Sequence, residues 1–483
     1  MAPVPWKIAD IVAATGGECL CGGDSCFFEG VSIDSRAITS KDIFVAVRGA
    51  THDGHTFIPQ VTALGVKGLV VDGRKVGDAE IASSKKVGIC CVAVKDTVRA
   101  LGDMAAFHRR RFQIPVVAVT GSNGKTSTKE MTASVMAQKY QTLKTTGNLN
   151  NEFGVPLTLL CLDNSHEAAV VEMGMNHPGE IRRLSQICQP DVGIITNIAP
   201  AHLEGLGSLE NVMAAKGELI ENIKESGAII LNGDDPCGLR LGASAARRVV
   251  YFGQGKNADF RAINIENDRE TGSEAKGFGT QFDLVLPQGS IPAKIQIKIP
   301  VPGRFMVSNA LAAAAAGYLN GVSPQEIQAG ISAFSPVRGR MNVRKSRQGF
   351  FIIDDSYNAN PGSMEAAIKT LVTLKGAQKG VLAAGDMREL GPDSEQLHEG
   401  IGRIAAQSGV DLLFLTGDFA AAVKKGAVSQ GMAGDRIMIG EKPDLAARLM
   451  KILGPGDWVL VKGSRSVGME TVVQLIAETD VTT

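Results

Sequence analysis

The sequence has no excess of charge of either sign, and this excludes several classes of function. Among its 483 residues, lysine plus arginine and aspartate plus glutamate number 50 each, so the formal net charge is zero. A surface that binds nucleic acid or an anionic membrane would normally need a basic excess. We therefore expect no nucleic-acid partner, and an anionic ligand must be held by a few local charges.

Long apolar segments are also missing. The run Ala310–Ala316 is the longest one of small apolar residues, and it is far shorter than the roughly 20 residues that span a bilayer. Met1–Trp6 contains no basic stretch followed by an apolar core, so no signal peptide is expected. These absences predict a cytoplasmic protein without membrane insertion.

The eight cysteines are scattered and lack the paired spacing of a zinc site. Cys19, Cys21 and Cys26 form the one cluster, and no second C-x₂-C-like pair lies near them in the sequence. A metal role for these three residues is the alternative, and reduced cytoplasmic thiols are the better interpretation. Repeats and low-complexity linkers are absent as well, so the chain must be divided by its pattern of strands and helices.

Length and pattern divide the chain into three α/β domains. At roughly 100–200 residues per domain, the length predicts about three domains. Residues 1–113 mix short β-rich runs, such as Asp42–Val47 and Gly68–Asp72, with glycine-rich turns, which indicates a mixed α/β domain. Residues 114–335 alternate buried strands with helices, which indicates a parallel sheet. The alternation restarts over 336–483 and predicts a second, Rossmann-like doubly wound sheet.

The strands of the two sheets can be placed by their apolar runs. We expect them at Ile114–Thr120, Ala168–Val171, Val192–Thr196, Ala228–Leu231, Phe350–Ile353, Gly380–Ala384, Asp411–Leu415, Arg436–Ile439 and Trp458–Val461. Residues 258–300 alternate apolar and polar side chains, which predicts a small antiparallel addition to the central sheet. Two helices should close the central domain, an alanine-rich one after Ser308 and one that begins at the capping box Ser323–Glu326.

A glycine loop between an expected strand and an expected helix carries the strongest functional motif. Its residues are Gly121, Ser122, Asn123, Gly124, Lys125, Thr126 and Ser127. In such a loop, backbone N–H groups bind phosphate oxygens, the lysine faces the β- and γ-phosphates, and the hydroxyl after it binds Mg²⁺. Position 119 is Val where the full Walker pattern has glycine, so the loop has the shorter GxxGK[ST] form. We predict ATP or GTP binding; a plain strand–helix turn is the alternative.

Three polar residues follow the central strands, at the sheet edge where ligands of parallel sheets bind. Glu172 follows Val171 and suits a Mg²⁺ ligand, with a capping or ion-paired carboxylate as the alternative. His202 follows a strand expected to end near Ile198, and an ordinary loop histidine is the alternative. Lys216 lies on a helix expected to begin near Ser208, and taken alone it would be a solvated lysine.

The C-terminal domain carries a second set of polar strand ends. Asp354 and Asp355 end one expected strand, and adjacent carboxylates rarely serve packing because burying charge is costly. Lys462, Ser464 and Arg465 follow the last expected strand, and the two cations suit a carboxylate or a phosphate, with a plain basic turn as the alternative. Two polar loops on two domains predict a cleft that closes on a nucleotide and a second, anionic substrate.

Ten stretches of the chain together resemble the Mur ligase family. They are residues 120–128 (TGSNGKTST), 145–160, 172–181, 197–208, 214–219, 303–315, 339–343, 354–367, 385–391 and 460–470. Within that family, the combination GNLNNEFGVPLTLL, DSYNANPGSM and GDMRELG is similar to the branch that adds a dipeptide, and the DNPR signature of the diaminopimelate-adding branch is absent. DSR at 34–36 and DGHTFI at 53–58 resemble the uridine-nucleotide domain of these branches.

The resemblance implies an ATP-dependent ligase of peptidoglycan synthesis that forms an amide bond through an acyl phosphate. Its partners would be UDP-N-acetylmuramoyl-tripeptide and D-alanyl-D-alanine, and a monomer is expected. Residues 1–113 would bind the UDP-sugar-peptide, the phosphate-loop domain 114–335 would bind ATP, and the Rossmann-like domain 336–483 would bind the incoming dipeptide. The third residue of the peptide is left open.

The resemblance also assigns roles to single residues. Lys125 and Thr126 would hold the ATP phosphates and one Mg²⁺, Glu172 would share an ion, and His202 would bind a second one. Lys216 matches a lysine that is carbamylated in the family. This disagrees with the interpretation of Lys216 as a solvated residue, which the sequence pattern alone favours. The other implied contacts are with adenine (Asn309, Asn358), phosphates or ribose (Arg340, Asp355), uridine nucleotide (Ser35, Arg36), muropeptide (Thr146, Asn148, Asn151), and the dipeptide or peptide carboxylates (Lys462, Ser464, Arg465).

Other activities stay open at this point. A second branch of the same family would use the same loop with a single amino acid. A folylpolyglutamate synthetase would share the phosphate loop, although that class lacks a long N-terminal uridine domain. A nucleotide-binding switch protein would not need the loop at 462–466, and a silent scaffold would not need the expected site residues.

Overall fold

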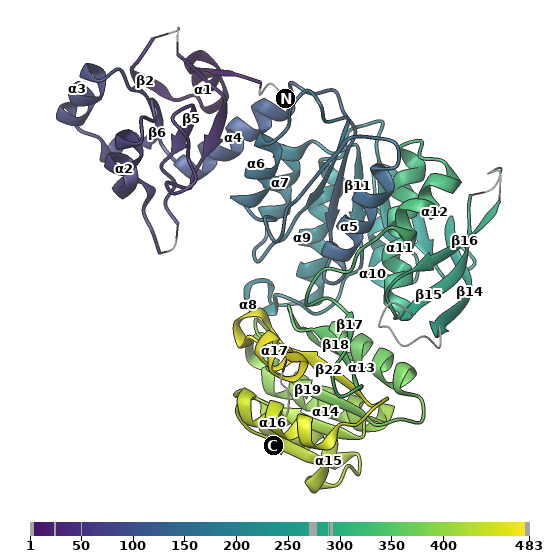
Figure 1. The fold of residues 1–483 in the computed structure, drawn as a ribbon. Helices are drawn as coiled ribbons and strands as arrows, with labels where there is room; N and C mark the ends of the chain where they lie inside the picture. The colour runs from purple at the N-terminus through teal and green to yellow at the C-terminus, as the bar shows by residue number, and fades with distance from the viewer. Residues whose placement is uncertain are drawn as a thin grey trace.

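The structure of the chain is a computed structural model that describes residues 4–23, 26–49, 51–269, 278–287, 289 and 293–478. Figure 1 shows three α/β units in chain order, with the N-terminal unit beside the central one and the C-terminal unit on another side of it. A five-stranded, a nine-stranded and a six-stranded sheet follow one another along the described chain. The predicted three-domain α/β fold is therefore confirmed, while the boundaries after residues 113 and 335 stay predictions.

The N-terminal unit is built on a mixed sheet. Its strand order is β2 (Glu18–Cys21), β7 (Cys90–Val94), β6 (Gly68–Asp72), β5 (Asp42–Val45) and β4 (Gly30–Ser32). A short pair, β1 (Trp6–Lys7) with β3 (Phe27–Phe28), accompanies it, and the helices are α1 (Ile8–Thr15), α2 (Ile58–Ala63), α3 (Asp78–Lys86) and α4 (Thr97–Arg109). The predicted strand Gly68–Asp72 is confirmed, and the one predicted at Asp42–Val47 ends at Val45.

Helix α4 belongs to two hydrophobic cores. Leu101 and Met104 are fully buried in the core of the N-terminal unit, whereas Ala105 and Ala106 pack into the core beneath the central sheet. At its end, the buried Arg109 guanidinium donates to the carbonyl oxygen of Cys188, 3.1 Å away. The first two units are thus joined by a shared, packed helix and not by a free linker.

The central unit is a largely parallel sheet with helices on both faces. Its order is β16 (Lys294–Ile299), β15 (Phe278–Val285), β14 (Phe260–Arg269), β13 (Arg248–Gly253), β12 (Ala228–Asn232), β11 (Val192–Ile195), β8 (Val116–Thr120), β10 (Ala168–Glu172) and β9 (Thr142–Lys144). One face carries α5 (Lys125–Met136), α11 (Arg304–Leu319) and α12 (Pro324–Ser332), and the other carries α6 (Gly154–Leu160), α7 (Glu180–Cys188) and α9 (Leu209–Glu221). Strands β14, β15 and β16 pair antiparallel, which confirms the predicted addition.

Some predicted ends in this unit are wrong for local reasons. Strand β8 begins at Val116 and not at Ile114, because Pro115 has no N–H for the ladder. Strand β11 ends at Ile195, well before Ile198, because the chain turns there toward the glycine loop. Helix α11 begins at Arg304, ahead of Ser308. The capping box before α12 is confirmed.

The C-terminal unit is the predicted doubly wound sheet. Its order is β17 (Asn342–Lys345), β18 (Phe351–Asp355), β22 (Trp458–Lys462), β19 (Gly380–Ala384), β20 (Leu412–Leu415) and β21 (Ile437–Ile439), and only the pair β17–β18 is antiparallel among these neighbours. Helices α13 (Pro361–Lys375), α14 (Ser394–Ser408) and α15 (Ala420–Ser429) cover one face, and α16 (Lys442–Ile452) and α17 (Glu470–Glu478) cover the other. None of the described helices is long and apolar enough to cross a bilayer.

Candidate active site

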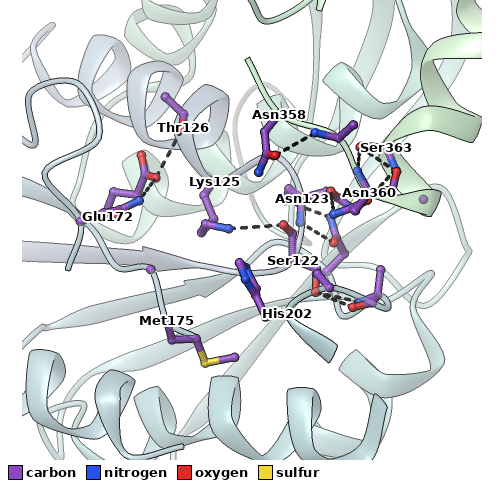
Figure 2. A pocket seen from close by; sticks show the side chains of 18 of the residues that line it. Ser122, Asn123, Lys125, Thr126, Glu172, Met175, His202, Asn358, Asn360 and Ser363 are labelled. Carbon is purple, nitrogen blue, oxygen red and sulfur yellow. Dashed lines mark hydrogen bonds between the residues drawn. The ribbon is translucent and has the colours of Figure 1, made fainter. Parts of the chain in front are cut away.

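A cavity of about 1290 Å³ lies between the central and C-terminal units. The central unit lines it with the glycine loop and with polar residues at the carboxyl ends of its strands. The C-terminal unit lines the opposite wall with the loop that follows β18, which Figure 2 shows by Asn358 and Asn360, and with the loop that follows β22. The predicted residues that meet in this cavity are Ser122, Asn123, Gly124, Lys125, Thr126, Ser127, Asn148, Asn151, Glu172, His202, Asn309, Arg340, Asp355, Asn358, Lys462, Ser464 and Arg465.

The glycine loop turns so tightly that larger residues would collide. Gly121 has φ 141°, and a Cβ atom there would lie 2.0 Å from Thr196 Oγ1. Gly124 has φ 79° and precedes α5, and a Cβ atom there would lie 2.4 Å from Asn309 Oδ1. The loop therefore directs the first N–H groups of α5, which lack partners within the helix, toward the cavity.

Lys125 folds back over this loop. Its Nζ donates to the carbonyl oxygens of Gly121 and Ser122, at 2.8 and 3.3 Å (Figure 2). Burial lowers the pKa of Lys125, and the Glu172 carboxylate opposes that shift. A lysine that is held only by carbonyl oxygens can turn to a phosphate without breaking an ion pair, as a nucleotide site requires.

Glu172 is a buried carboxylate with one unsatisfied oxygen. Its Oε1 accepts from Asn150 Nδ2 at 2.8 Å and from Thr126 Oγ1 at 3.3 Å. Its Oε2 is buried and accepts from none of the described residues. Leaving such an oxygen without a donor costs about 1–3 kcal/mol or more, and a hard cation beside the Thr126 hydroxyl would remove that cost. The capping or ion-paired alternative does not match these neutral partners.

Lys216 lies inside the protein, which corrects its assignment as a solvated lysine. It sits on α9, with 1% of its surface exposed, behind the residues that line the cavity. Burial lowers the pKa of Lys216 well below its usual range, and the neighbouring Lys125 cation lowers it further. No described carboxylate contributes to the shift. The side chain therefore favours a neutral amine.

His202 contacts the opposite domain. It lies in the left-handed region with φ 55°, and its Nδ1 is 2.6 Å from Oε2 of Glu389 in the C-terminal unit. This hydrogen bond, together with the His202 and Lys125 charges, lowers the pKa of Glu389. An ordinary loop histidine would not need a carboxylate from another domain.

The basic residues of the C-terminal wall do not form a plain exposed turn, because one of them is buried in an ion pair. Lys462 is 2% exposed, and its Nζ donates to the Asp355 carboxylate and to the carbonyl oxygen of Asn358. Burial raises the pKa of Asp355, and Lys462 opposes the shift. The guanidinium groups of Arg340 and Arg465 lie 4.3 and 5.5 Å from the ring centroid of Tyr357. Lys462 therefore holds the end of β18 and the loop after it in place, and the two arginines supply cations at the cavity.

Comparison with known proteins gives the family. Residues 28–109 match the model "Mur ligase family, catalytic domain", 119–317 match "Mur ligase middle domain", and 339–465 match "Mur ligase, glutamate ligase domain". The chain is 37% identical over 459 residues to the UDP-N-acetylmuramoyl-tripeptide–D-alanyl-D-alanine ligase of Escherichia coli, covering 94% of this chain and 95% of that protein. The chain belongs to the Mur ligase family.

Solved Mur ligases share the whole fold. A crystal structure of MurF from Acinetobacter baumannii superposes with a TM-score of 0.88 at 33% identity, covering 99% of this chain and 100% of the other. MurF from Thermotoga maritima, solved in complex with ADP, superposes with a TM-score of 0.79 at 27% identity, covering 93% and 97%. The three-domain architecture of this Mur ligase is therefore shared along nearly its full length.

Some predicted residues of this Mur ligase lie away from the cavity. Thr146 is exposed and does not line it. In the N-terminal unit, Ser35 is buried, and the exposed Arg36 pairs with Asp34 at 2.8 Å. Their assigned contacts with the muropeptide and the uridine nucleotide stay predictions.

The sequence reasoning missed several residues at the cavity. Asn150 holds Glu172, Asn197 Oδ1 accepts from the backbone N–H of Asn123 at 3.0 Å, and Asn360 Nδ2 donates to Asn123 Oδ1 at 2.7 Å across the domains. Each lies in a stretch that carried the family resemblance, and Asn197 also follows a strand. A search of every amide at strand ends would have found Asn197, but spacing gave no indication of the contact between Asn123 and Asn360.

The residues present fit a Mg²⁺ ion. Thr126 and Glu172 supply a hydroxyl and an unsatisfied buried carboxylate oxygen side by side. Oxygen ligands of this kind are what Mg²⁺ prefers. No group of three or more His, Cys, Asp or Glu residues in the described part of the chain is arranged to hold a metal by itself, so the fit depends on this hydroxyl and this carboxylate.

Proposed function

We propose that this chain joins D-alanyl-D-alanine to UDP-N-acetylmuramoyl-tripeptide, with hydrolysis of ATP, in peptidoglycan synthesis. The full-length similarity to the E. coli enzyme of that name carries the proposal. A cavity with a phosphate loop on one wall and arginines on the other supports it, because the reaction brings together ATP and carboxylate substrates. The chain would act in the cytoplasm as a monomer, and its eight free thiols fit a reducing compartment.

The central unit would bind ATP. Lys125 and the N–H groups of the glycine loop would hold the phosphates, and Thr126 is placed for the accompanying cation. Asn309, whose amide lies against Gly124, and Asn358 on the opposite wall would contact the adenine. Arg340 and Asp355 would face the phosphates or ribose. The T. maritima relative, solved in complex with ADP, supports this assignment.

The chemistry must convert a poor acyl donor into a good one. Transfer of the γ-phosphoryl group to the peptide carboxylate forms an acyl phosphate and releases ADP. The dipeptide amine then attacks the acyl carbon, and the tetrahedral intermediate expels phosphate and leaves the amide. Lys125 offsets charge on the transferring oxygens, and the protein otherwise positions the reactants, so no side-chain nucleophile is required.

Thr126, Glu172, His202 and Lys216 would hold Mg²⁺, with two ions expected. The ions would neutralise charge on the phosphate oxygens. For Lys216, we propose that its buried neutral amine adds to CO₂, forming an N–C bond and releasing a proton. The product is a carbamate, whose anionic oxygen atoms could bind Mg²⁺.

The substrates would occupy the remaining surfaces. The N-terminal unit, proposed as residues 1–113, would bind the uridine nucleotide at Ser35 and Arg36. The muropeptide would lie along Thr146, Asn148 and Asn151 in the central unit, proposed as 114–335. The dipeptide or the peptide carboxylates would meet Lys462, Ser464 and Arg465 in the C-terminal unit, proposed as 336–483.

Phosphate release tests the proposal. The purified chain is given ATP, Mg²⁺ and UDP-N-acetylmuramoyl-tripeptide, with D-alanyl-D-alanine or single amino acids as the acceptor. We expect release only with the dipeptide, with a product of matching mass. Release with one amino acid would indicate another branch, release with a folate and glutamate would indicate a folylpolyglutamate synthetase, and release without any acceptor would indicate a nucleotide switch.

A further inference from the structure

Glu389 brings a carboxylate of the C-terminal unit to the nucleotide side of the cavity. Its Oε2 lies 2.6 Å from His202 Nδ1, although the two residues are 187 positions apart. The contact is reinforced by the backbone, since the N–H of Glu204 donates to the carbonyl oxygen of Glu389 at 3.3 Å. Sequence reasoning gave Glu389 no role, and the reaction chemistry above does not use it.

The geometry fixes what this carboxylate does to the ring. A carboxylate accepts from Nδ1–H, which leaves the lone pair of the imidazole on Nε2. The backbone of His202 is held as well, because the N–H groups of Gly205 and Leu206 donate to its carbonyl oxygen at 3.2 and 3.0 Å. These hydrogen bonds hold the position of the histidine, and in the neutral ring they favour the tautomer with its proton on Nδ1.

The loop that carries Glu389 is fixed to its own domain. The backbone N–H of Arg388 donates to Ser464 Oγ at 2.8 Å. The Arg388 guanidinium pairs with Asp386 and Asp418, both at 3.1 Å. Glu389 can therefore reach His202 only when the whole C-terminal unit lies against the central one.

We propose that Glu389 is a positioning residue that orients His202 for a divalent cation and makes this ligand depend on the placement of the C-terminal unit. The inference rests on the proposed function, in which His202 is a metal ligand. It means that the C-terminal unit contributes a carboxylate that orients a ligand in the proposed metal site of the central unit.

The test compares Glu389→Ala, Glu389→Gln and the matched control Glu204→Gln. Glu204 is an exposed acid on α8 (Leu203–Leu206) of the central unit, and the control leaves its backbone hydrogen bond to Glu389 in place. Mn²⁺ binding to the full chain with ADP is measured by water proton relaxation. We expect about tenfold weaker Mn²⁺ binding for Glu389→Ala, the loss typical when a group that orients a metal ligand is removed. Glu389→Gln should be intermediate, because its amide oxygen still accepts, and Glu204→Gln should match the wild type.

Kinetics give the second readout. For Glu389→Ala we expect kcat to fall while KM for ATP stays within about twofold, because the residue does not touch the nucleotide. Mn²⁺ binding equal to or tighter than that of the wild type would overturn the proposal. If the wild type showed no release that depends on D-alanyl-D-alanine, the proposed function would fail, whereas the Mn²⁺ titration would still report on Glu389.

A separate observation concerns two cysteines of the N-terminal unit. The Sγ atoms of Cys26 and Cys90 lie 2.6 Å apart, so a small movement would bring them to the bond length of a disulfide, about 2.05 Å. Cys90 is buried at the start of β7, and Cys26 is partly exposed. Gly22 passes so close that a Cβ atom there would lie 2.6 Å from Cys90 Sγ, so the backbone of Gly22 is packed onto this sulfur.

We infer that Cys26 and Cys90 are a site of oxidative modification. When peroxide oxidises the pair, the two residues form an intramolecular disulfide with each other. Peroxide oxidises the Cys26 thiol to a sulfenic acid and releases water. The Cys90 thiol then attacks that sulfur and releases a second water as the S–S bond forms. Cys26 reacts first because it is the more exposed thiol, and burial raises the pKa of Cys90 to about 12.

Peptide mapping of the full chain after hydrogen peroxide treatment tests this site. We expect a Cys26–Cys90 crosslink, a loss of two titratable thiols and recovery with dithiothreitol. Cys26→Ser should remove the crosslink, whereas Cys161→Ser, at an exposed thiol of the central unit, should keep it. The wild-type protein alone can decide against the inference. It would do so if Cys26 became a stable sulfinic acid without a crosslink, or if a bond formed between Cys21 and Cys91 instead.

Discussion

At the scale of single residues, the site depends on side chains whose charge is set by burial. Lys125 is held by two carbonyl oxygens, Glu172 keeps one oxygen without a donor, and Lys216 has no described anion to pair with. Each of these arrangements is costly without a ligand. Together they indicate a site whose polar groups lack partners until ligands bind.

Replacing Lys125 by alanine should abolish ATP turnover. The cation that faces the transferring phosphoryl group would be lost, and removal of one such group costs about 10²–10³-fold in rate. Phosphate release with both co-substrates is the measurement, and Lys256→Ala, at an exposed lysine of the same unit, is the control. Near-wild-type turnover in Lys125→Ala would contradict the phosphate-loop assignment.

Replacing Lys216 by alanine should remove most of the activity, and short carboxylic acids should restore part of it. The added acid would supply the oxygen ligand that the carbamate provides, in a space that the shorter side chain leaves. Activity is measured against acetate or formate concentration, with Lys256→Ala at the same concentrations as the control. Normal activity in the mutant, with no effect of added acid, would count against carbamylation.

At this scale the sequence reached only part of the site. Lys125 and Thr126 were predicted from the glycine-loop motif, and Glu172 from its position at a strand end, because a parallel sheet brings such ends together. The burial of Lys216 and the contact of Glu389 with His202 could not be predicted, because both depend on how α9 and the third domain pack. The family resemblance pointed to Lys216, whereas spacing favoured a solvated residue.

At the scale of elements, the β8–loop–α5 segment forms the wall of the cavity that is proposed to bind the nucleotide. A buried strand of valine and alanine ends at Thr120, two glycines with positive φ turn the chain, and α5 begins at Lys125. The strand–loop–helix order was predictable because apolar runs and glycines are local features. The exact strand ends were not predictable in the same way. They depend on which backbone groups pair in the folded sheet, as at Pro115 and at the turn after Ile195.

Gly124→Ala should weaken nucleotide binding much more than it weakens the fold. A left-handed non-glycine residue costs about 1–2 kcal/mol, and the methyl group would also collide with Asn309, which should displace the loop. Titration calorimetry with ADP should show at least about tenfold weaker binding, since each 1.4 kcal/mol is tenfold. Gly434→Ala is the control, because that glycine has no positive φ and open space around it. Equal ADP affinity in Gly124→Ala and wild type would contradict the loop geometry.

At the scale of the whole molecule, the three units are joined unequally. The N-terminal and central units share α4 and the buried Arg109. The C-terminal unit meets the central one through polar contacts at the cavity, such as those of Asn360 and Glu389, and through an aromatic contact in which Phe278 of β15 packs against Phe351 and Trp458. These side-chain contacts are smaller than the packing of a whole helix into two cores, so they separate more easily. The C-terminal unit is therefore the part expected to move when substrates bind.

Distances between spin labels should show this difference. Cysteines introduced at Val87, Leu239 and Val428 would label the three units at exposed positions, after Cys19 and Cys161 are replaced by serine. On adding a non-hydrolysable ATP analogue and the tripeptide substrate, we expect the 239–428 distance to change and the 87–239 distance to stay constant. A change in the 87–239 distance alone would contradict the unequal joining.

The shared helix also sets how the molecule melts. Helix α4 cannot lose its place in one core while keeping it in the other, because different faces of the same helix belong to different cores. The N-terminal and central units should therefore behave as one cooperative block, although they contain two separate sheets. The structure has three domains, but we expect only two units that unfold cooperatively. A destabilising change in the N-terminal core should therefore lower the melting temperature of the central domain as well.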